Sequence, residues 1–272
     1  MATSDISLTA GMRTNLLNLQ NTSTLLNRTQ QRLSSGKQVN SALDNPTNYF
    51  AAQSATQRAS DLSARKDGMS EAVQTVSASN AGITAITGLL QAAKGISQSA
   101  LSTSDTNVQS KLAAQYDTIR TQIDQMSSDA GYKGLNLLSA NNTLTVTFNE
   151  NASSSLSVIG FLGNSAGLSL TPSLGNWQSA SAITTDTAKM DSAITTLRTN
   201  TQTLASILNV ITTRQGLTDS MINTLQTGAD NLTLADMNTE GANMLMLQTR
   251  QQLGTTSLSM SSQAAQSVLK LF

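Results

Sequence analysis

The sequence predicts a mainly α-helical fold in which long antiparallel helices from both chain ends form a coiled-coil-like bundle, with a small β-hairpin insertion. Three observations support this fold class. Apolar residues recur every seven positions through several long stretches, which is the period of a coiled-coil seam. Only two prolines occur in 272 residues, so little interrupts these helices. Glycines, the single tryptophan and two short alternating runs gather between about residues 130 and 178.

The first helix is expected over about residues 4–33. Its apolar positions lie seven apart, with one leucine at an intermediate position: Met12, Leu16, Leu19, Leu26 and Leu33. The other intermediate positions are polar, and burying one leucine contributes only about 1.5–3 kcal/mol. Ordering each backbone unit costs about 1–2 kcal/mol. We therefore expect this helix to become stable only against partners; an ordinary amphipathic helix of a globular core is the alternative interpretation.

Residues 34–46 are predicted to form a turn-rich connector. Gly36 is placed to take the left-handed conformation that ends a helix, and Pro46 can occupy the first turn of the next one. That second helix is expected from about residue 46 to residue 98. The following loop ends in Asp105, which can cap a third helix that reaches about Met126 and closes a bundle of antiparallel helices.

The most regular seam runs from Met190 to Leu225, in a helix that would span roughly 54 Å. The second helix has the same seven-residue period and a similar length, so we predict that these two helices pack against each other. The predicted bundle seam consists of Leu62, Met69, Val76, Ile83, Leu90, Ile194, Leu197, Leu204, Leu208, Ile211, Ile222 and Leu225.

Residues 143–148 and 156–161 alternate in polarity and contain β-branched side chains, which predicts a hairpin or small sheet. Ser, Thr and Asn are frequent around them, so we expect the insertion to be an exposed tip. The last helix is expected from about residue 234 to the end of the sequence. One apolar stripe of this helix consists of Met246, Leu253, Met260, Ala264 and Leu271, and a second consists of Met237, Met244, Leu258, Ala265 and Phe272. An apolar chain end adds little to a monomer because ends fray, so we expect other subunits to cover it.

Composition excludes several functional classes. Cysteine and histidine are absent, which excludes disulfides, thiolate nucleophiles and Ser-His triads and removes the commonest zinc ligands. Charged residues make up 12% and the formal net charge is zero, which disfavours a nucleic-acid partner and favours association of like copies. No stretch approaches twenty successive apolar residues, so membrane insertion is not expected. We predict a protein that is not an enzyme and has no catalytic residues, cofactor or metal.

Two acidic groupings are the best candidates for chemistry. The acids between residues 61 and 71 share a helix with interleaved cations, so an ion-pair face is favoured over general acid–base catalysis. Asp124 and Asp129, with Asn136, offer oxygen ligands for a cation, and a plain surface is again favoured. The ten methionines follow helical stripes, where adaptable packing is the ordinary interpretation and a peptide-binding groove the alternative.

Three motifs resemble those of bacterial flagellin. Residues 33–46, which read Leu-Ser-Ser-Gly-Lys-Gln-Val-Asn-Ser-Ala-Leu-Asp-Asn-Pro, are similar to the N-terminal signature of that family. Ala-Asp-Met-Asn-Thr-Glu at 235–240 and Gln-Gln-Leu-Gly-Thr at 251–255 resemble its C-terminal signature. Gly-Tyr-Lys-Gly-Leu-Asn-Leu-Leu at 131–138 is similar to an internal element in which Lys133 replaces the usual Asn. The motifs stand in the same order as in the family.

The resemblance implies a structural subunit that polymerises into the helical bacterial flagellar filament for motility. It implies an inner coiled-coil domain of residues 1–40 and 233–272, which forms the filament core and is disordered before assembly. A helical bundle of residues 41–129 and 179–232 would form the next shell, and residues 130–178 would face solvent. The implied location is extracellular, after export in the unfolded state without a cleaved signal peptide, which agrees with the lack of a signal-like start.

The resemblance also implies partners. These are further copies of the chain, the flagellar export apparatus, the filament cap and a secretion chaperone, for which Met246, Leu253 and Met260 are candidate contacts. Many relatives carry Leu-Gln-Arg-Val-Arg-Glu-Leu where residues 90–96 read Leu-Gln-Ala-Ala-Lys-Gly-Ile, so we expect weak recognition by the animal Toll-like receptor for flagellin. A hook–filament junction protein and a secreted coiled-coil effector or adhesin are the alternatives.

Overall fold

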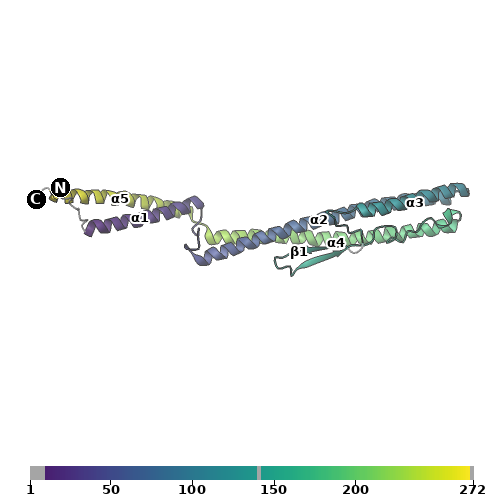
Figure 1. The fold of residues 1–272 in the computed structure, drawn as a ribbon, viewed down its shortest axis with the longest axis horizontal. Coiled ribbons are helices and arrows are strands. Elements are labelled where there is room, and N and C mark those ends of the chain that lie inside the picture. Colours follow the sequence, from purple (N-terminus) through teal and green to yellow (C-terminus); the bar gives the residue numbers. More distant parts are fainter. Residues whose placement is uncertain (1–9, 140–141, 270–272) are drawn as a thin grey trace, which may run out of the picture. The chain divides into compact units, whose positions relative to one another are not determined.

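The computed structural model describes residues 10–139 and 142–269. Over these residues, Figure 1 shows helices α1 (Ala10–Ser35), α2 (Pro46–Leu101) and α3 (Thr106–Asp129), strands β1 (Thr143–Thr147) and β2 (Ser155–Ile159), a short 3-10 helix η1 (Leu174–Trp177), and helices α4 (Ala180–Thr233) and α5 (Met237–Leu269). The predicted mainly α-helical fold with a small hairpin is confirmed. The part of the first helix expected before residue 10 lies outside the described residues.

Local sequence signals account for the ends of the helices. Gly36 follows α1 with φ +68°, the left-handed conformation that ends a helix without steric cost for glycine. Pro46 is the first residue of α2. The Asp105 side chain caps α3 by accepting a hydrogen bond from the backbone N–H of Asn107 at 2.8 Å. None of the described helices is both long and apolar enough to cross a membrane.

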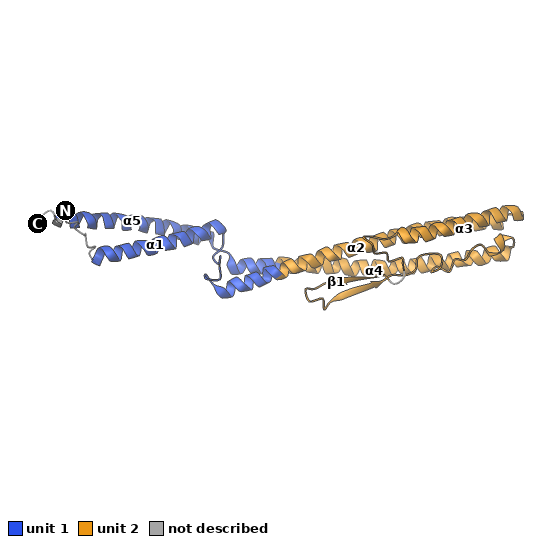
Figure 2. Cartoon of the chain, in the orientation of Figure 1, with its two compact units in different colours: residues 1–57, 224–272 blue, residues 58–223 orange. Residues whose placement is uncertain are grey.

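The chain divides into two compact units, coloured separately in Figure 2. Unit 1 consists of residues 1–57 and 224–272, and unit 2 consists of residues 58–223. Unit 1 therefore holds α1, α5 and the adjoining ends of α2 and α4, while unit 2 holds the remainder of those two helices together with α3 and the hairpin. The segment expected to form a separate insertion, residues 130–178, belongs to the same unit as the bundle helices.

Within unit 2, α2 and α4 run antiparallel in one constant register. Lys66 of α2 forms an ion pair with Asp219 of α4 at 2.6 Å, and Lys94 forms one with Asp191 at 2.5 Å. The two lysines are 28 residues apart and so are the two aspartates, which is four heptads in each helix. Equal spacing on both helices means that no residue is inserted or skipped between these contacts.

The predicted bundle seam lies at this helix pair. The seam residues of α2 are all buried, and those of α4 are buried or half-buried. The buried members are Leu62, Met69, Val76, Ile83, Leu90, Ile194, Leu197, Leu204 and Ile211, and the half-buried members are Leu208, Ile222 and Leu225. Within unit 2, Val76, Ile83, Leu90, Ile194, Leu197 and Leu204 belong to one buried cluster, to which helix α3 adds Ala113, Tyr116 and Ile123. Met69 and Ile211 belong to a second, smaller cluster.

The insertion packs against the helices as well as facing solvent. Strands β1 and β2 pair antiparallel from Thr143 opposite Ile159 to Thr147 opposite Ser155. Val146 and Val158 are buried against the bundle, whereas the alternate positions are exposed apart from the half-buried Thr147. Further apolar residues of the same segment are also buried, namely Leu137, Leu138, Leu168, Leu170 and Trp177. The expectation of an exposed tip therefore holds for only one face, because spaced apolar residues are enough to anchor a polar segment.

Helix carboxylates fasten the loop that follows the hairpin. Asp124 accepts hydrogen bonds from the backbone N–H and the hydroxyl of Ser165, at 2.7 and 2.9 Å, and Asp117 binds Ser173 in the same way at 2.9 Å for both contacts. The fully buried Asp186 accepts a hydrogen bond from the indole N–H of Trp177 at 2.9 Å. Such charge-assisted bonds hold the loop on α3 and α4 and satisfy otherwise buried polar groups.

Trp177 is the largest side chain in this anchored segment. Its ring stacks on that of Tyr116 with 5.1 Å between the ring centroids. Burial raises the pKa of the Tyr116 hydroxyl, which donates a hydrogen bond to the carbonyl oxygen of Thr171 at 3.0 Å. The single tryptophan is thus a core residue and leaves no exposed indole for ligand stacking.

Candidate assembly surface

Helices α1 and α5 of unit 1 pair antiparallel (Figure 1). Near one end of the pair the Asn15 amide donates to the hydroxyl of Ser257 at 3.1 Å, and near the other end Arg32 Nη1 lies 3.0 Å from Glu240 Oε1. Beyond Arg32, backbone hydrogen bonds join the segment that follows α1 to the segment that precedes α5, from Gln38 N–H to Thr233 O at 2.7 Å and from Ala235 N–H to Gly36 O at 3.0 Å. The polar contacts and the backbone junction therefore agree on one register.

Two paired helices can bury only one face of each, and much of the apolar surface of this pair stays exposed. In the described parts of α1 and α5, Met12 and Leu247 are the buried large apolar residues. Eight others are exposed: Leu16, Leu17, Leu25, Met237, Leu245, Met246, Leu253 and Met260. Leu245 and Leu253 are 67% and 65% exposed. Large apolar side chains that stay exposed in such number on one helix pair indicate an interaction site.

The predicted subunit-contact residues fall on both faces. Met12 is buried, and Leu19, Leu26 and Leu33 are half-buried between the two helices. The remaining predicted residues within the described range are exposed: Leu16, Met246, Leu253 and Met260. Leu271 and Phe272 lie outside the described residues.

The side of α5 that faces α1 consists of residues that the hydrophobic pattern did not predict. Glu240, Leu247 and Gly254, seven residues apart, face α1. The predicted stripe of Met246, Leu253 and Met260 has the same spacing but points outward. Exposed leucines at 17, 25 and 245 were also missed because they lie beside the seam. A search for two adjacent stripes of period seven, one of them containing charged or small residues, would have found both faces.

The Asp44 carboxylate holds the connector between α1 and α2 in place by hydrogen bonds. Asp44 accepts hydrogen bonds from the Arg28 guanidinium at 2.9 Å, the Ser41 hydroxyl at 3.0 Å and the backbone N–H groups of Asn40 and Ser41. The Arg28 contact has the largest effect and lowers the pKa of Asp44 to about 2. Asp44 therefore remains charged at neutral pH and holds the connector beside the last turns of α1.

Glu71 and Asp124, two of the acidic candidates for chemistry, take part in structural contacts. Glu71 forms an ion pair with Lys133 at 2.7 Å. The Asp124 carboxylate is bound by Ser165, and the Asn136 amide donates to the carbonyl oxygens of residues 127 and 128. Within the described ranges no three acidic side chains lie close enough together to hold a metal ion. These groups act as structural contacts of unit 2.

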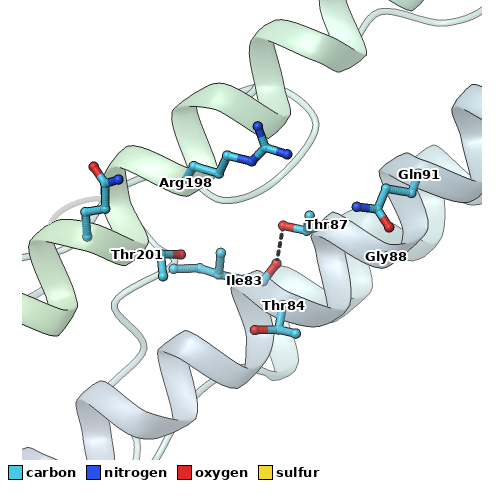
Figure 3. A pocket seen from close by; sticks show the side chains of 8 residues that line it. Ile83, Thr84, Thr87, Gly88, Gln91, Arg198 and Thr201 are labelled. Carbon is cyan, nitrogen blue, oxygen red and sulfur yellow. Dashed lines mark hydrogen bonds between the residues drawn. The ribbon is translucent and has the colours of Figure 1, made fainter.

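A groove of about 580 Å³ lies between α2 and α4 in unit 2. Figure 3 shows Arg198 of α4 extending toward Gln91 of α2, and the Thr87 hydroxyl donating to the carbonyl oxygen of Ile83 at 2.8 Å. Gly88, which lacks a side chain, widens the groove between them. The lining contains one charged side chain and no acid, so it provides no acid–base pair.

Residues 6–143 match the family model described as the bacterial flagellin N-terminal helical region. The flagellins FljO and FljK of Caulobacter vibrioides are 29% and 30% identical to this chain, over 276 and 281 aligned residues, and each comparison covers all of both proteins. The crystal structure of Bacillus cereus flagellin is similar with a TM-score of 0.48 and 17% identity, and the match covers 61% of this chain and 93% of that one.

Proposed function

Because this chain belongs to the bacterial flagellin family and is a subunit of the flagellar filament, we propose that the exposed apolar face of α1 and α5 is the surface through which it polymerises. We call this set of residues, Leu16, Leu17, Leu25, Met237, Leu245, Met246, Leu253 and Met260, the outward face. The full-length relatives favour a filament subunit over a junction protein, effector or adhesin.

One observation carries the proposal, namely that the α1–α5 pair leaves more large apolar side chains exposed than it buries. Each such side chain contributes about 1.5–3 kcal/mol when it is fully buried. Neighbouring copies supply the missing cover when the same pair from each subunit packs in the filament core. Residues 1–40 and 233–272 thus form the inner domain, residues 41–129 and 179–232 the next shell, and the open face of residues 130–178 looks outward.

The proposal is tested on the outward face of α5. Leu253→Gln with Met260→Gln removes two exposed apolar side chains without altering the inner contacts to α1. The concentration needed for seeded polymerisation should rise at least about tenfold, since each lost contact is worth about 1.5 kcal/mol or more. Sedimentation of filaments grown on short fragments, with electron microscopy, measures the change.

A matched variant on the same helix is Thr249→Gln with Thr256→Gln, because both threonines are exposed and polar. That variant should polymerise like the parent chain. If the Leu253 and Met260 variant also polymerised at the parent concentration, the outward face would have no part in assembly.

The same face explains the other partners that we propose. Before assembly, an exposed apolar helix needs a cover, and a secretion chaperone that contacts Met246, Leu253 and Met260 would provide one. Export proceeds in the unfolded state through the flagellar channel without a cleaved signal peptide, and the filament cap receives the chain at the growing end. The outward face is then buried among copies.

We further propose weak stimulation of the animal Toll-like receptor. Relatives with the sequence Leu-Gln-Arg-Val-Arg-Glu-Leu offer two arginines and a glutamate, whereas residues 90–96 retain only Lys94 as a charged group. Lys94 is engaged within the chain by Asp191 at 2.5 Å. Fewer charged donors and acceptors are therefore available for a receptor.

A further inference from the structure

The apolar contacts between α1 and α5 repeat every seven residues and therefore specify their register poorly. Met12, Leu19, Leu26 and Leu33 are equivalent positions along α1. If one helix slid by seven residues, each of these side chains would meet the position that its neighbour had occupied. A pairing that depended on apolar packing alone would tolerate such a slip, as coiled coils do when nothing polar marks the register.

Arg32 and Glu240 are different in kind from the rest of this seam. Their side chains are 20% and 8% exposed, and a single contact of 3.0 Å joins them. Arg32 Nε and Glu240 Oε2 are buried and have no hydrogen-bond partner among the described residues. A buried ion pair with unsatisfied atoms contributes little net stability, whereas separating its members leaves a charge buried alone. Its effect is thus on which pairing forms.

A slip of one heptad separates the pair in either direction. In the observed register Arg32 faces residue 240; displaced by seven residues, it faces Leu247 or Thr233. In the same two registers Glu240 faces Val39 or Leu25, respectively. Each slipped register therefore buries at least one charge against an apolar side chain, which is the arrangement that costs most.

A second contact discriminates registers by shape. A side-chain carbon at Gly254 would lie 2.9 Å from Leu19 Cδ2, so Leu19 fits only where α5 has no side chain. Displaced by seven residues, Leu19 would meet Leu247 or Ser261 instead. Charge at one end of the pair and shape in its middle thus favour the same register.

From these contacts we propose that Arg32 and Glu240 are the positioning residues that fix the register of α1 against α5 as each subunit joins the filament. The inference rests on the proposed function, in which this helix pair forms the filament core. A chain that arrives unfolded has to select one register among several with similar apolar contacts. The ion pair makes that selection, and the backbone junction at Gln38 and Thr233 then closes behind it.

The experiment uses disulfide formation to measure the register, because the chain has no cysteine of its own. Asn15→Cys with Ser257→Cys marks the observed register, since the two side chains are 3.1 Å apart. Asn15→Cys with Ala264→Cys marks the register that is displaced by seven residues. Each cysteine pair is placed in the full-length chain, grown on filament fragments and oxidised. The parent should give at least tenfold more of the first disulfide than of the second.

Two variants then test the ion pair. Arg32→Met with Glu240→Met keeps apolar bulk and removes both charges, and the ratio of the two disulfides should fall toward one. Arg32→Glu with Glu240→Arg restores an attractive pair, and the tenfold ratio should return. If the methionine variant fails to polymerise while the charge-exchanged variant polymerises, an attractive ion pair at these two positions is required for assembly.

Other outcomes overturn the inference. An unchanged ratio in the methionine variant would assign the register to the backbone junction and to Gly254. Failure of both variants to polymerise, with a normal parent, would show that these two positions serve packing and not register. These results are separate from failure of the proposed function, which would appear as normal polymerisation of the Leu253 and Met260 variant.

Discussion

At the scale of single residues, Lys133 has a strained backbone conformation that an ion pair with Glu71 partly compensates. It has φ +48°, in the left-handed region that favours Asn or Gly over other residues. The related internal element carries Asn at this position, so the substitution to Lys introduces backbone strain. The ion pair of Lys133 with Glu71 at 2.7 Å compensates in part, and it raises the pKa of Lys133. Because both side chains are exposed, solvent screening keeps the contribution of this ion pair small.

We predict that Lys133→Asn unfolds at higher urea than Lys133→Gln. Both changes remove the ion pair with Glu71, but only Asn also relieves the left-handed strain. The difference in free energy of unfolding should be about 0.5–1 kcal/mol in favour of Asn. Urea unfolding of the soluble chain, followed by circular dichroism, measures it. Equal midpoints for the two variants would mean that the turn at 131–135 is unstrained.

Asp44 makes the stability of the connector depend on pH in the acid range. Its pKa is lowered to about 2 by the Arg28 guanidinium, which means that the charged carboxylate is more stable in the folded chain than in the unfolded chain. That stability is fully present above the unfolded pKa of about 3.9 and is lost as the pH falls toward about 2.

We predict that Asp44→Asn destabilises the chain by about 1 kcal/mol at pH 6, a value discounted because Arg28 is partly exposed. The difference between Asp44→Asn and the parent should shrink to a small fraction as the pH falls to about 2, where about half of the parent carboxyl groups are protonated. Urea unfolding at several pH values measures both free energies. A difference that persists unchanged in acid would assign the effect to lost hydrogen bonds of the neutral group.

At the scale of helices, the period and length of each helix are easier to predict from the sequence than the face by which it packs against another helix. The predicted seam residues of α2 and α4 are buried or half-buried where the two helices pair. Both helices are apolar at most seam positions and are long enough to match each other. Helix α5 carries two stripes of the same period, one residue apart. Periodicity cannot tell which stripe faces α1, since the inner stripe contains Glu240 and Gly254 and scores as less apolar.

The glycines of α5 provide a prediction at this scale. A side-chain carbon at Gly241 meets open space, whereas one at Gly254 meets Leu19. Gly241→Ala should therefore gain the full helix propensity of alanine, about 1 kcal/mol, and raise the melting temperature of filaments. Gly254→Ala should raise it less or lower it, because Leu19 has to shift. Thermal melting followed by circular dichroism compares the two, and equal effects would show that Leu19 does not need the space at residue 254.

At the scale of the whole molecule, the assignment to a filament subunit came from motifs at both ends together with the apolar helices between them. What composition and period could not predict was the anchoring of residues 130–178. Trp177 and Asp186 become buried together, yet each stands in a polar context that reads as surface. Long-range contacts of this kind depend on the fold and leave no periodic signal in the sequence.

The proposal of weak receptor recognition can be tested at residues 90–96 of α2, which lie in unit 2. Ala92 and Gly95 are both exposed, and a side chain at Gly95 meets no atom within 4 Å. Ala92→Arg with Gly95→Glu restores the two missing charged groups and should raise stimulation of reporter cells about tenfold or more, as charge-assisted hydrogen bonds would.

The matched control for this prediction is Ala92→Gln with Gly95→Gln, which adds similar bulk without charge and should leave stimulation low. Strong stimulation by the unaltered chain would contradict the proposal of weak recognition.

The hairpin has a practical consequence. Its strands end at a turn in which residues 151–153 are exposed, while the anchored loop behind it keeps Val146 and Val158 on the bundle. An exposed loop tip between firmly held strands tolerates added chain well. Since we propose that residues 130–178 face outward in the filament, a foreign epitope grafted between Asn151 and Ser153 should be displayed in a dense, regularly repeated array. This turn is therefore suited to building a multivalent antigen carrier.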